Sequence, residues 1–230
     1  MAEFIDEAFL EMQQEREREA RRQALEEQLS IPNVVEGIQS GLLVLGAEEL
    51  HFTETMLLDR KISLRIPTSF TPMPEEYVAI KYPAARRPKY IFTDDSLCIN
   101  VNVNPTENRM YNDEMKKMHT ELMGMLGRMQ PNASWLEQDV LQLGECMDFY
   151  HEKQVIGEEQ KQVGFYECIT PAMDGSIYSL TFFIAYEEKG LFFSLNCTEK
   201  HMKLWRPIAH GIMASLRVYV PDMEGGLGDE

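Results

Sequence analysis

The chain has too little positive charge to act as a nucleic-acid-binding protein. Its 230 residues include 22 lysines and arginines against 38 aspartates and glutamates, which gives a formal net charge of -16. Binding to phosphates requires a basic surface that releases counterions, and this charge balance opposes it. We therefore expect no nucleic-acid partner, and an acidic surface that favours solubility and basic protein partners.

Long apolar runs and a secretory signal are also missing. No run approaches the ~20 apolar residues that a membrane-spanning helix needs. The first residues, MAEFIDEAFLEMQQ, lack the basic start and apolar core of a signal peptide. Cysteine is scarce, and none of Cys98, Cys146, Cys168 and Cys197 forms a CxxC pair, as expected for reduced, buried thiols. These features predict a cytoplasmic protein that does not contact a membrane.

No catalytic or cofactor-binding signature is present. The phosphate-binding patterns GxxxxGK[ST] and GxGxxG are absent, and no histidine pair has the i, i+4 spacing of a helical metal site. Cys197 and His201 lie four residues apart, so a turn could bring them together as nucleophile and base. A small thiol-dependent hydrolase is therefore the alternative to a protein without catalytic residues, metal or cofactor.

Two adjacent strand-like segments dominate what is present. Residues 176–186 (SIYSLTFFIAY) and 190–197 (GLFFSLNC) are apolar on both alternating faces, so both faces of their sheet must be covered. Amphipathic segments before them (112–129) and after them (199–218) can supply two covering helices. The pattern predicts an α+β fold in which an antiparallel sheet has helices on both faces, an α/β/α sandwich.

The chain divides into an arm, one domain and a tail. Residues 1–47 are predicted to hold an N-terminal helix (3–29) and a mixed connector with glycine and proline punctuation. Residues 48–220 hold the sandwich domain, whose short, turn-rich connectors predict an antiparallel meander. The acidic tail, 221–230 (PDMEGGLGDE), is predicted to be disordered.

Several local strings in this order resemble bacterial proteins of the PsbP/Mog type, with which DcrB-like proteins are grouped. They are HFTETMLLDRKISLRIPTSFTPMP, IKYP followed by RRP, YIFTDDSLCINVNVN, and a closing WRPIAHGIMASLRV. The resemblance covers residues 48–218 and omits the arm. It implies an antiparallel sheet flanked by helices, which agrees with the periodicity. It also implies an assembly or binding factor without a general catalytic centre.

Two segments are candidates for binding a protein partner. The first is a row of amides on one face of a strand, made by Asn100, Asn102 and Asn104. The second is a proline-bounded basic and aromatic loop with Lys81, Tyr82, Arg86 and Arg87. The amide row could instead be a solvated or loop-covered sheet face. Arg87 could instead tie its loop to a neighbouring acidic residue.

The N-terminal helix is a candidate docking arm. Its first half carries an apolar stripe, whereas its middle, QQEREREARRQ, is polar all round; the stripe consists of Phe4, Ile5, Ala8, Phe9 and Met12. A short isolated helix is marginal in water and needs packing to be stable. The stripe could fold back on its own domain, dock on another chain or in a homo-oligomer, or fray as chain termini do.

Taken together, these features predict a non-enzymatic protein-binding or adaptor protein. An immunity-like or chaperone-like role toward a basic partner is the sharper form of this prediction, because of the acidic charge. Beside the thiol hydrolase, the other alternative is a structural subunit that assembles through its N-terminal helix.

Overall fold

The structure is a computed structural model that describes residues 2–83, 87–143, 145–148, 161–172 and 175–220. For residues 2–11, 145–148 and 220 it describes the backbone alone. Its helices are α1 (Ala2–Gln28), α2 (Ile31–Ser40), α3 (Glu75–Lys81), α4 (Met115–Met129) and α5 (Met202–Ala214), with the 3-10 helix η1 (Glu199–His201) directly before α5.

The described strands form two sheets. The five-stranded sheet has the order β1 (Leu42–Leu45), β2 (Glu48–Leu57), β3 (Ile62–Pro67), β12 (Arg217–Val220), β8 (Glu145–Asp148). The seven-stranded sheet has the order β4 (Thr71–Pro72), β5 (Tyr90–Thr93), β6 (Ile99–Arg109), β11 (Lys189–Thr198), β10 (Gly175–Tyr186), β9 (Gln162–Ala172), β7 (Ser134–Gln142). Among the described residues, neighbouring strands pair antiparallel, except that β12 and β8 run parallel.

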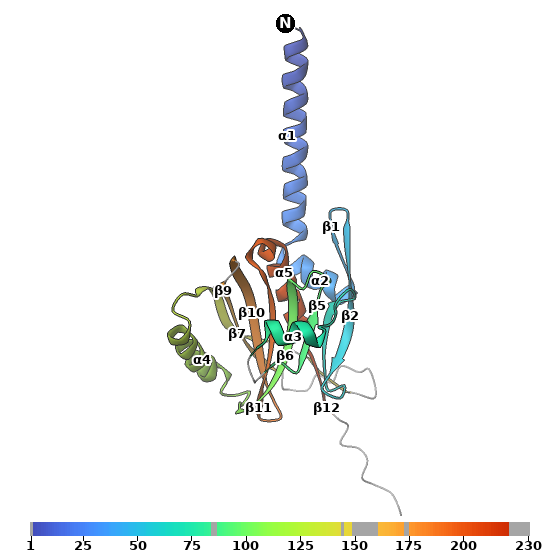
Figure 1. Ribbon diagram of the computed structural model, residues 1–230. Coiled ribbons are helices and arrows are strands. Elements are labelled where there is room, and N and C mark those ends of the chain that lie inside the picture. Colours follow the sequence, from blue (N-terminus) through green and yellow to red (C-terminus); the bar gives the residue numbers. More distant parts are fainter. Residues whose placement is uncertain (1, 84–86, 144, 149–160, 173–174, 221–230) are drawn as a thin grey trace, which may run out of the picture.

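The seven-stranded sheet has helices on both faces, which confirms the predicted sandwich (Figure 1). Alternation along β10 explains why. Phe182 points into the main core and stacks on Phe193, with ring centroids 4.7 Å apart. Its neighbour Phe183 points the other way, stacks on Phe192 and packs in the cluster that contains Met115 of α4. On the first face, α5, with α2 packed against it, shares the main core with the five-stranded sheet. Helices α3 and α4 cover the second face.

Residues 30–47 are part of the packed domain, so the prediction of a mixed connector there is wrong. Helix α2 buries Val34 and Ile38 completely, and β1 buries Leu43 and Leu45 in the same main core. Gly211 of α5 permits the close approach of α2, because a Cβ there would lie 2.5 Å from Ile38 Cδ1. The packed structure therefore begins at about Ile31.

Two further elements differ from the prediction. The closing helix ends at Ala214, and the chain then forms β12 beside β3, where a helix to residue 218 was expected. Strand β8 joins the five-stranded sheet, parallel to β12, and so does not belong to the antiparallel meander that was predicted. The predicted disordered tail, 221–230, lies outside the described residues.

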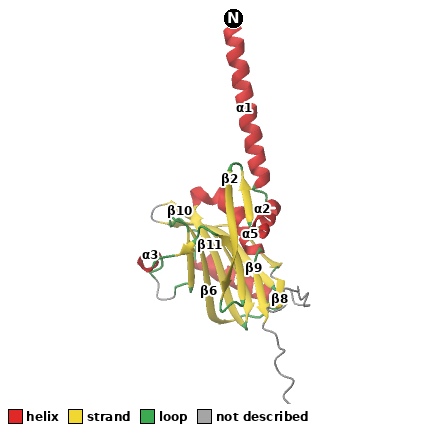
Figure 2. Ribbon diagram, turned by 90° about the vertical axis from the view of Figure 1, so that its right-hand side faces the viewer, coloured by secondary structure: helices red, strands yellow, loops and turns green. Residues whose placement is uncertain are grey.

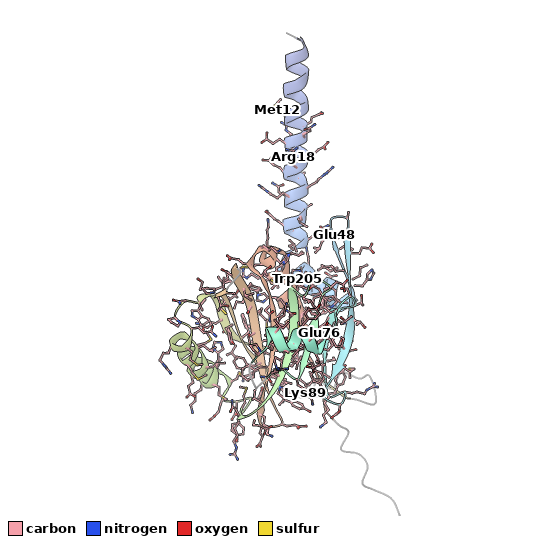
Figure 3. The ribbon with its side chains drawn as sticks, viewed as in Figure 1. Met12, Arg18, Glu48, Glu76, Lys89 and Trp205 are labelled. Carbon is pink, nitrogen blue, oxygen red and sulfur yellow. The ribbon has the colours of Figure 1, made fainter. Side chains whose placement is uncertain are left out.

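Helix α1 projects from the domain along most of its length (Figures 1 and 2). Every described side chain from Met12 to Glu27 is exposed, and Met12 and Arg18 lie well clear of the domain (Figure 3). No helix in the described part of the chain is both long enough and apolar enough to cross a membrane.

Candidate functional site

The predicted amide row lies on the face of β6 that α3 and the segment after it cover. Tyr82, just beyond α3, donates a hydrogen bond from its hydroxyl to Asn102 Oδ1 at 3.1 Å. Asn102 Nδ2 donates to Ser194 Oγ at 3.2 Å, and Asn100 Nδ2 donates to Asn196 Oδ1 at 3.0 Å. Burial raises the pKa of Tyr82, and the amides of Asn102 and Asn196 oppose that rise. The structure thus brings Tyr82 and the amide row together.

These contacts correct the view of the row as an exposed partner surface. Asn100 and Asn102 are 5% and 4% exposed, and their amide groups bond to the neighbouring strand. Only Asn104 is half-buried. Because Tyr82 and Ser194 bond the side chain of Asn102, and Asn196 accepts from the amide nitrogen of Asn100, both asparagines are internal hydrogen-bonding groups. Asn100 Oδ1 is the one atom of this set that is buried without a partner among the described residues.

The basic residues of the loop have separate roles. Lys81 Nζ donates to the carbonyl oxygen of Leu97, which ties α3 to the turn before β6. Arg87 Nη1 lies 3.9 Å from Glu75 Oε2, in an ion pair whose side chains are 39% and 92% exposed. Such an exposed pair is weak. Arg86 lies outside the described residues, so its predicted role stays a prediction.

A buried ion cluster lies under α5. Glu167 of β9 has no exposed side-chain surface, although it lies in a strand whose other inward residues are apolar. Arg206 donates from Nε to Glu167 Oε2 at 2.7 Å and from Nη2 to Glu137 Oε2 of β7 at 2.9 Å. His210, one turn further along α5, forms a close hydrogen bond with Glu167 Oε1.

The electrostatics of this cluster keep Glu167 ionised. Burial by itself would raise the pKa of Glu167, but hydrogen bonds from His210 and Arg206 outweigh burial and hold the pKa below its usual value. The hydrogen bond to Glu167 raises the pKa of Arg206. Tyr178, fully buried nearby, has its pKa raised by burial and then by the negative charge of Glu167.

The cluster has the donor atoms of a metal site, but an arginine already pairs with both of its carboxylates. One ligand atom each from Glu137, Glu167 and His210 lies within 4.8 Å of the others. The guanidinium of Arg206 donates to both carboxylates and supplies the positive charge that a cation would otherwise provide. The arrangement therefore fits a structural tie between α5 and the sheet better than a metal centre.

Sequence reasoning missed this cluster, although the sequence contained a signal for it. Glu167 is the single acidic residue in an otherwise apolar strand pattern, and Arg206 and His210 are four apart on the helix that covers that strand. An acid among inward residues needs a partner when it is buried. Here Arg206 and His210 of α5 are the partners of Glu167.

The arrangement of Cys197 and His201 does not support a thiol nucleophile. Cys197 is 1% exposed, and burial raises its pKa to about 12. His201 Nδ1 instead shares a hydrogen bond of 3.0 Å with Thr198 Oγ1. A thiol with so high a pKa is almost wholly protonated at neutral pH, and a protonated thiol is a poor nucleophile. The hydrolase alternative therefore has no support from Cys197.

A hollow lies beside the C-terminal end of α1, where the predicted docking arm meets the domain. The hollow encloses about 530 Å³ between the end of α1, the start of α2 and the first turns of α5; it is lined by Glu26, Leu29, Ile31, Glu199, Met202, Lys203, Arg206 and Pro207. Ile31 and the nearby Leu25 are 43% and 37% exposed. At the other end of α1, Met12 is 54% exposed, whereas the side chains of Phe4, Ile5 and Phe9 lie outside the described set. Apolar surface thus lies open at the base of the arm.

The sandwich described above is a fold of the PsbP/Mog type, as the sequence resemblance implied. The solution structure of cyanobacterial PsbP (CyanoP) from Synechocystis sp. PCC 6803 matches with a TM-score of 0.50 and 11% identity, over 76% of this chain and 96% of that one. At this identity the likeness shows the fold alone.

Two further solved structures match less closely. The Ran-binding protein Mog1p of Saccharomyces cerevisiae has a TM-score of 0.41 and 11% identity, over 74% of this chain and 96% of its own. LpqN, involved in cell envelope biogenesis of Mycobacterium tuberculosis, has a TM-score of 0.45 and 10% identity, over 74% and 91%. No protein-family model and no curated protein sequence matches the chain.

Proposed function

We propose that the chain is a non-enzymatic adaptor that binds a protein partner, with α1 as its docking element. The observation that carries this proposal is the projection of α1, a helix of 27 residues whose described side chains are exposed from Met12 to Glu27. Its length is about 40 Å at 1.5 Å per residue. A helix held out in solvent is stable when another surface covers its apolar residues, and the first turns contain Phe4, Ile5 and Phe9.

The acidic charge favours a basic partner. With a net charge of -16, the chain attracts cationic surfaces and accelerates their association at low ionic strength. An immunity-like or chaperone-like role, in which the acidic protein covers a basic one, is the specific form that we propose. Occurrence of the same fold in PsbP and in a Ran-binding protein is compatible with a binding role.

The basic loop after α3 is proposed as a second contact surface. The ion pair between Arg87 and Glu75 is exposed and 3.9 Å long, so it holds the guanidinium loosely and leaves donors free for a carboxylate of the partner. Arg87→Ala should accordingly weaken partner binding while changing the stability of the domain by within about 0.5 kcal/mol.

Capture with variants of the full-length chain tests the role of α1. Tagged parent, Phe9→Asp and Gln14→Asp chains would be expressed in the native cell, and the proteins that copurify would be identified by mass spectrometry. Gln14→Asp is the matched control, because it adds the same charge at an exposed polar position on the other side of the helix from Phe9. We expect a stoichiometric partner with parent and control, released by salt and lost with Phe9→Asp.

Two outcomes would overturn the proposal. Equal capture by the parent and Phe9→Asp chains would remove α1 from the binding surface. The absence of any stoichiometric protein with all three chains would remove the adaptor function itself.

A further inference from the structure

We propose that α1 pairs with α1 of a second copy of this chain, antiparallel, in the register where facing residue numbers add to 33. The inference rests on the proposed docking role of α1 and names the occupant of that helix. It follows from one face of α1, continued by Leu29 directly after the helix, whose residues are spaced alternately by four and three positions. We call this face the pairing stripe: Phe4, Ala8, Glu11, Glu15, Arg18, Arg22, Leu25 and Leu29.

Alternate spacing of four and three is that of the a and d positions of a heptad, which keeps the stripe on one side of a helix. The described residues agree with this placement. Glu15, Arg18 and Arg22 line one shallow hollow along α1. Leu29 lines the hollow at the base, and Leu25 lies one turn before it on the helix. The stripe therefore continues from the charged middle of the helix to the domain.

The stripe is complementary to itself when it is reversed. In the proposed register, Phe4 faces Leu29 and Ala8 faces Leu25, so each apolar end meets an apolar end. Toward the middle, Glu11 faces Arg22 and Glu15 faces Arg18, so each acid meets a base. Each of the four facing pairs therefore joins either two apolar residues or two residues of opposite charge.

Flanking positions do not disturb this register. In an antiparallel pair the flanking contacts are Ile5 with Glu26, Met12 with Glu19, Glu7 with Gln28 and Gln14 with Arg21. None of these pairs brings like charges together. A parallel pair would instead place each residue of the stripe opposite its own copy, with Glu15 on Glu15 and Arg18 on Arg18, which like-charge repulsion opposes.

The hollow at the base of α1 accommodates the end of the partner helix. Where Phe4 of one copy reaches Leu29 of the other, Ala2 and Glu3 of the first copy lie over the hollow of the second, whose lining includes both Ile31 and Lys203. Phe4 cannot reach its own hollow, because 25 residues of straight helix separate Phe4 from Leu29 by about 38 Å. The hollow can therefore be reached by the first turn of α1 only from a second copy.

Cysteine cross-linking tests the orientation. Chains with Ala8→Cys and chains with Leu25→Cys, carrying different tags, would be mixed and treated with a short thiol cross-linker. The antiparallel register predicts a mixed dimer and no dimer of either variant alone, since identical sites would lie about 25 Å apart. Unsubstituted chain measures the background from native cysteines, of which Cys98 is half-buried.

Charge exchange tests the register. By light scattering, the parent should have twice the chain mass of 26.6 kDa at high concentration. Arg18→Glu turns both central Glu15–Arg18 pairs into like charges, so we expect its dimer dissociation constant to rise at least about tenfold. The exchanged variant Glu15→Arg with Arg18→Glu restores the pairs, and its dissociation constant should return to within about threefold of the parent value.

The outcomes separate this inference from the proposed function. A parent that stays monomeric, cross-linking of each variant with itself, or failure of the exchanged variant to recover would each overturn the antiparallel pair. Capture of a basic partner by α1, lost with Phe9→Asp, would still support the adaptor even if the pair were overturned.

Discussion

Removal of Arg206 should weaken the fold much more than its half-exposed position suggests. Arg206→Met keeps an unbranched, flexible side chain but removes the two donors that reach Glu167 and Glu137. Glu167 would then be a fully buried carboxylate with His210 as its remaining partner. Breaking a buried ion pair by removing one partner costs about 3–5 kcal/mol. Because Arg206 is 38% exposed, we expect a value near the lower limit, about 3 kcal/mol.

Thermal unfolding followed by near-ultraviolet circular dichroism measures this cost. A loss of about 3 kcal/mol corresponds to a fall in Tm of about 6–12 °C for a domain of this size. Glu137→Gln is the matched control, since Glu137 is 49% exposed and its ion pair is worth at most about 1 kcal/mol. A Tm for Arg206→Met within about 2 °C of the parent value would show that Arg206 does not stabilise Glu167.

The pH dependence supplies a second readout. Because the folded pKa of Glu167 lies below its ordinary value of 4.5, its contribution to stability is complete above about pH 4.5. That contribution is lost as the pH falls through the lower, folded pKa. In Arg206→Met the folded pKa should rise toward or above 4.5, so the parent should lose its advantage in stability over the variant as the medium is acidified.

Three further predictions concern packing, the amide row and the thiols. Gly211→Ala should lower the free energy of unfolding by about 1–3 kcal/mol, measured by urea denaturation, because the added methyl group overlaps a side chain of α2. Tyr82→Phe should cost about 1 kcal/mol in the same assay through loss of the hydrogen bond to Asn102, and an unchanged value would mean that this bond adds nothing. A thiol reagent at neutral pH should modify Cys98 well before Cys197, whose pKa is raised to about 12, and the reverse order would contradict the burial described.

Alternation along single strands was the part of the fold that sequence could predict. Phe182 and Phe183 are neighbours with opposite orientations, and their apolar character required cover on both faces of the sheet. The same alternation put Asn100 and Asn102 on one face, as observed. It could not predict their burial, because the cover comes from Tyr82, whose position depends on how α3 packs. The alternation of residues predicts which face of a strand a side chain lies on, but not which other element covers that face.

Short elements and the ion cluster were missed for a different reason. Helix α2 has standard boundary signals, a proline in its first turn and Gly41 with a φ of +90° at its end, but it has only 10 residues, and its proline and glycines are equally typical of a connector. Glu167 is one of 38 acidic residues, and its position on the inward side of an apolar strand pattern is a weak signal among so many. The packing of α5 on β9 shows that Glu167 is buried and which residues pair with it.

Both edges of the seven-stranded sheet are unsuited to the addition of a strand from another protein. Strand β4, at one edge, has two residues, and one of them is Pro72, which lacks the amide hydrogen that a new strand would accept. Strand β7, at the other edge, has a register shift between Trp135 and Glu137 and carries charged, exposed residues. Bulges and charges of this kind discourage edge-to-edge aggregation. Both edges therefore disfavour the addition of a partner's strand by backbone hydrogen bonds. A protein that binds at this sheet would have to be recognised through side-chain contacts.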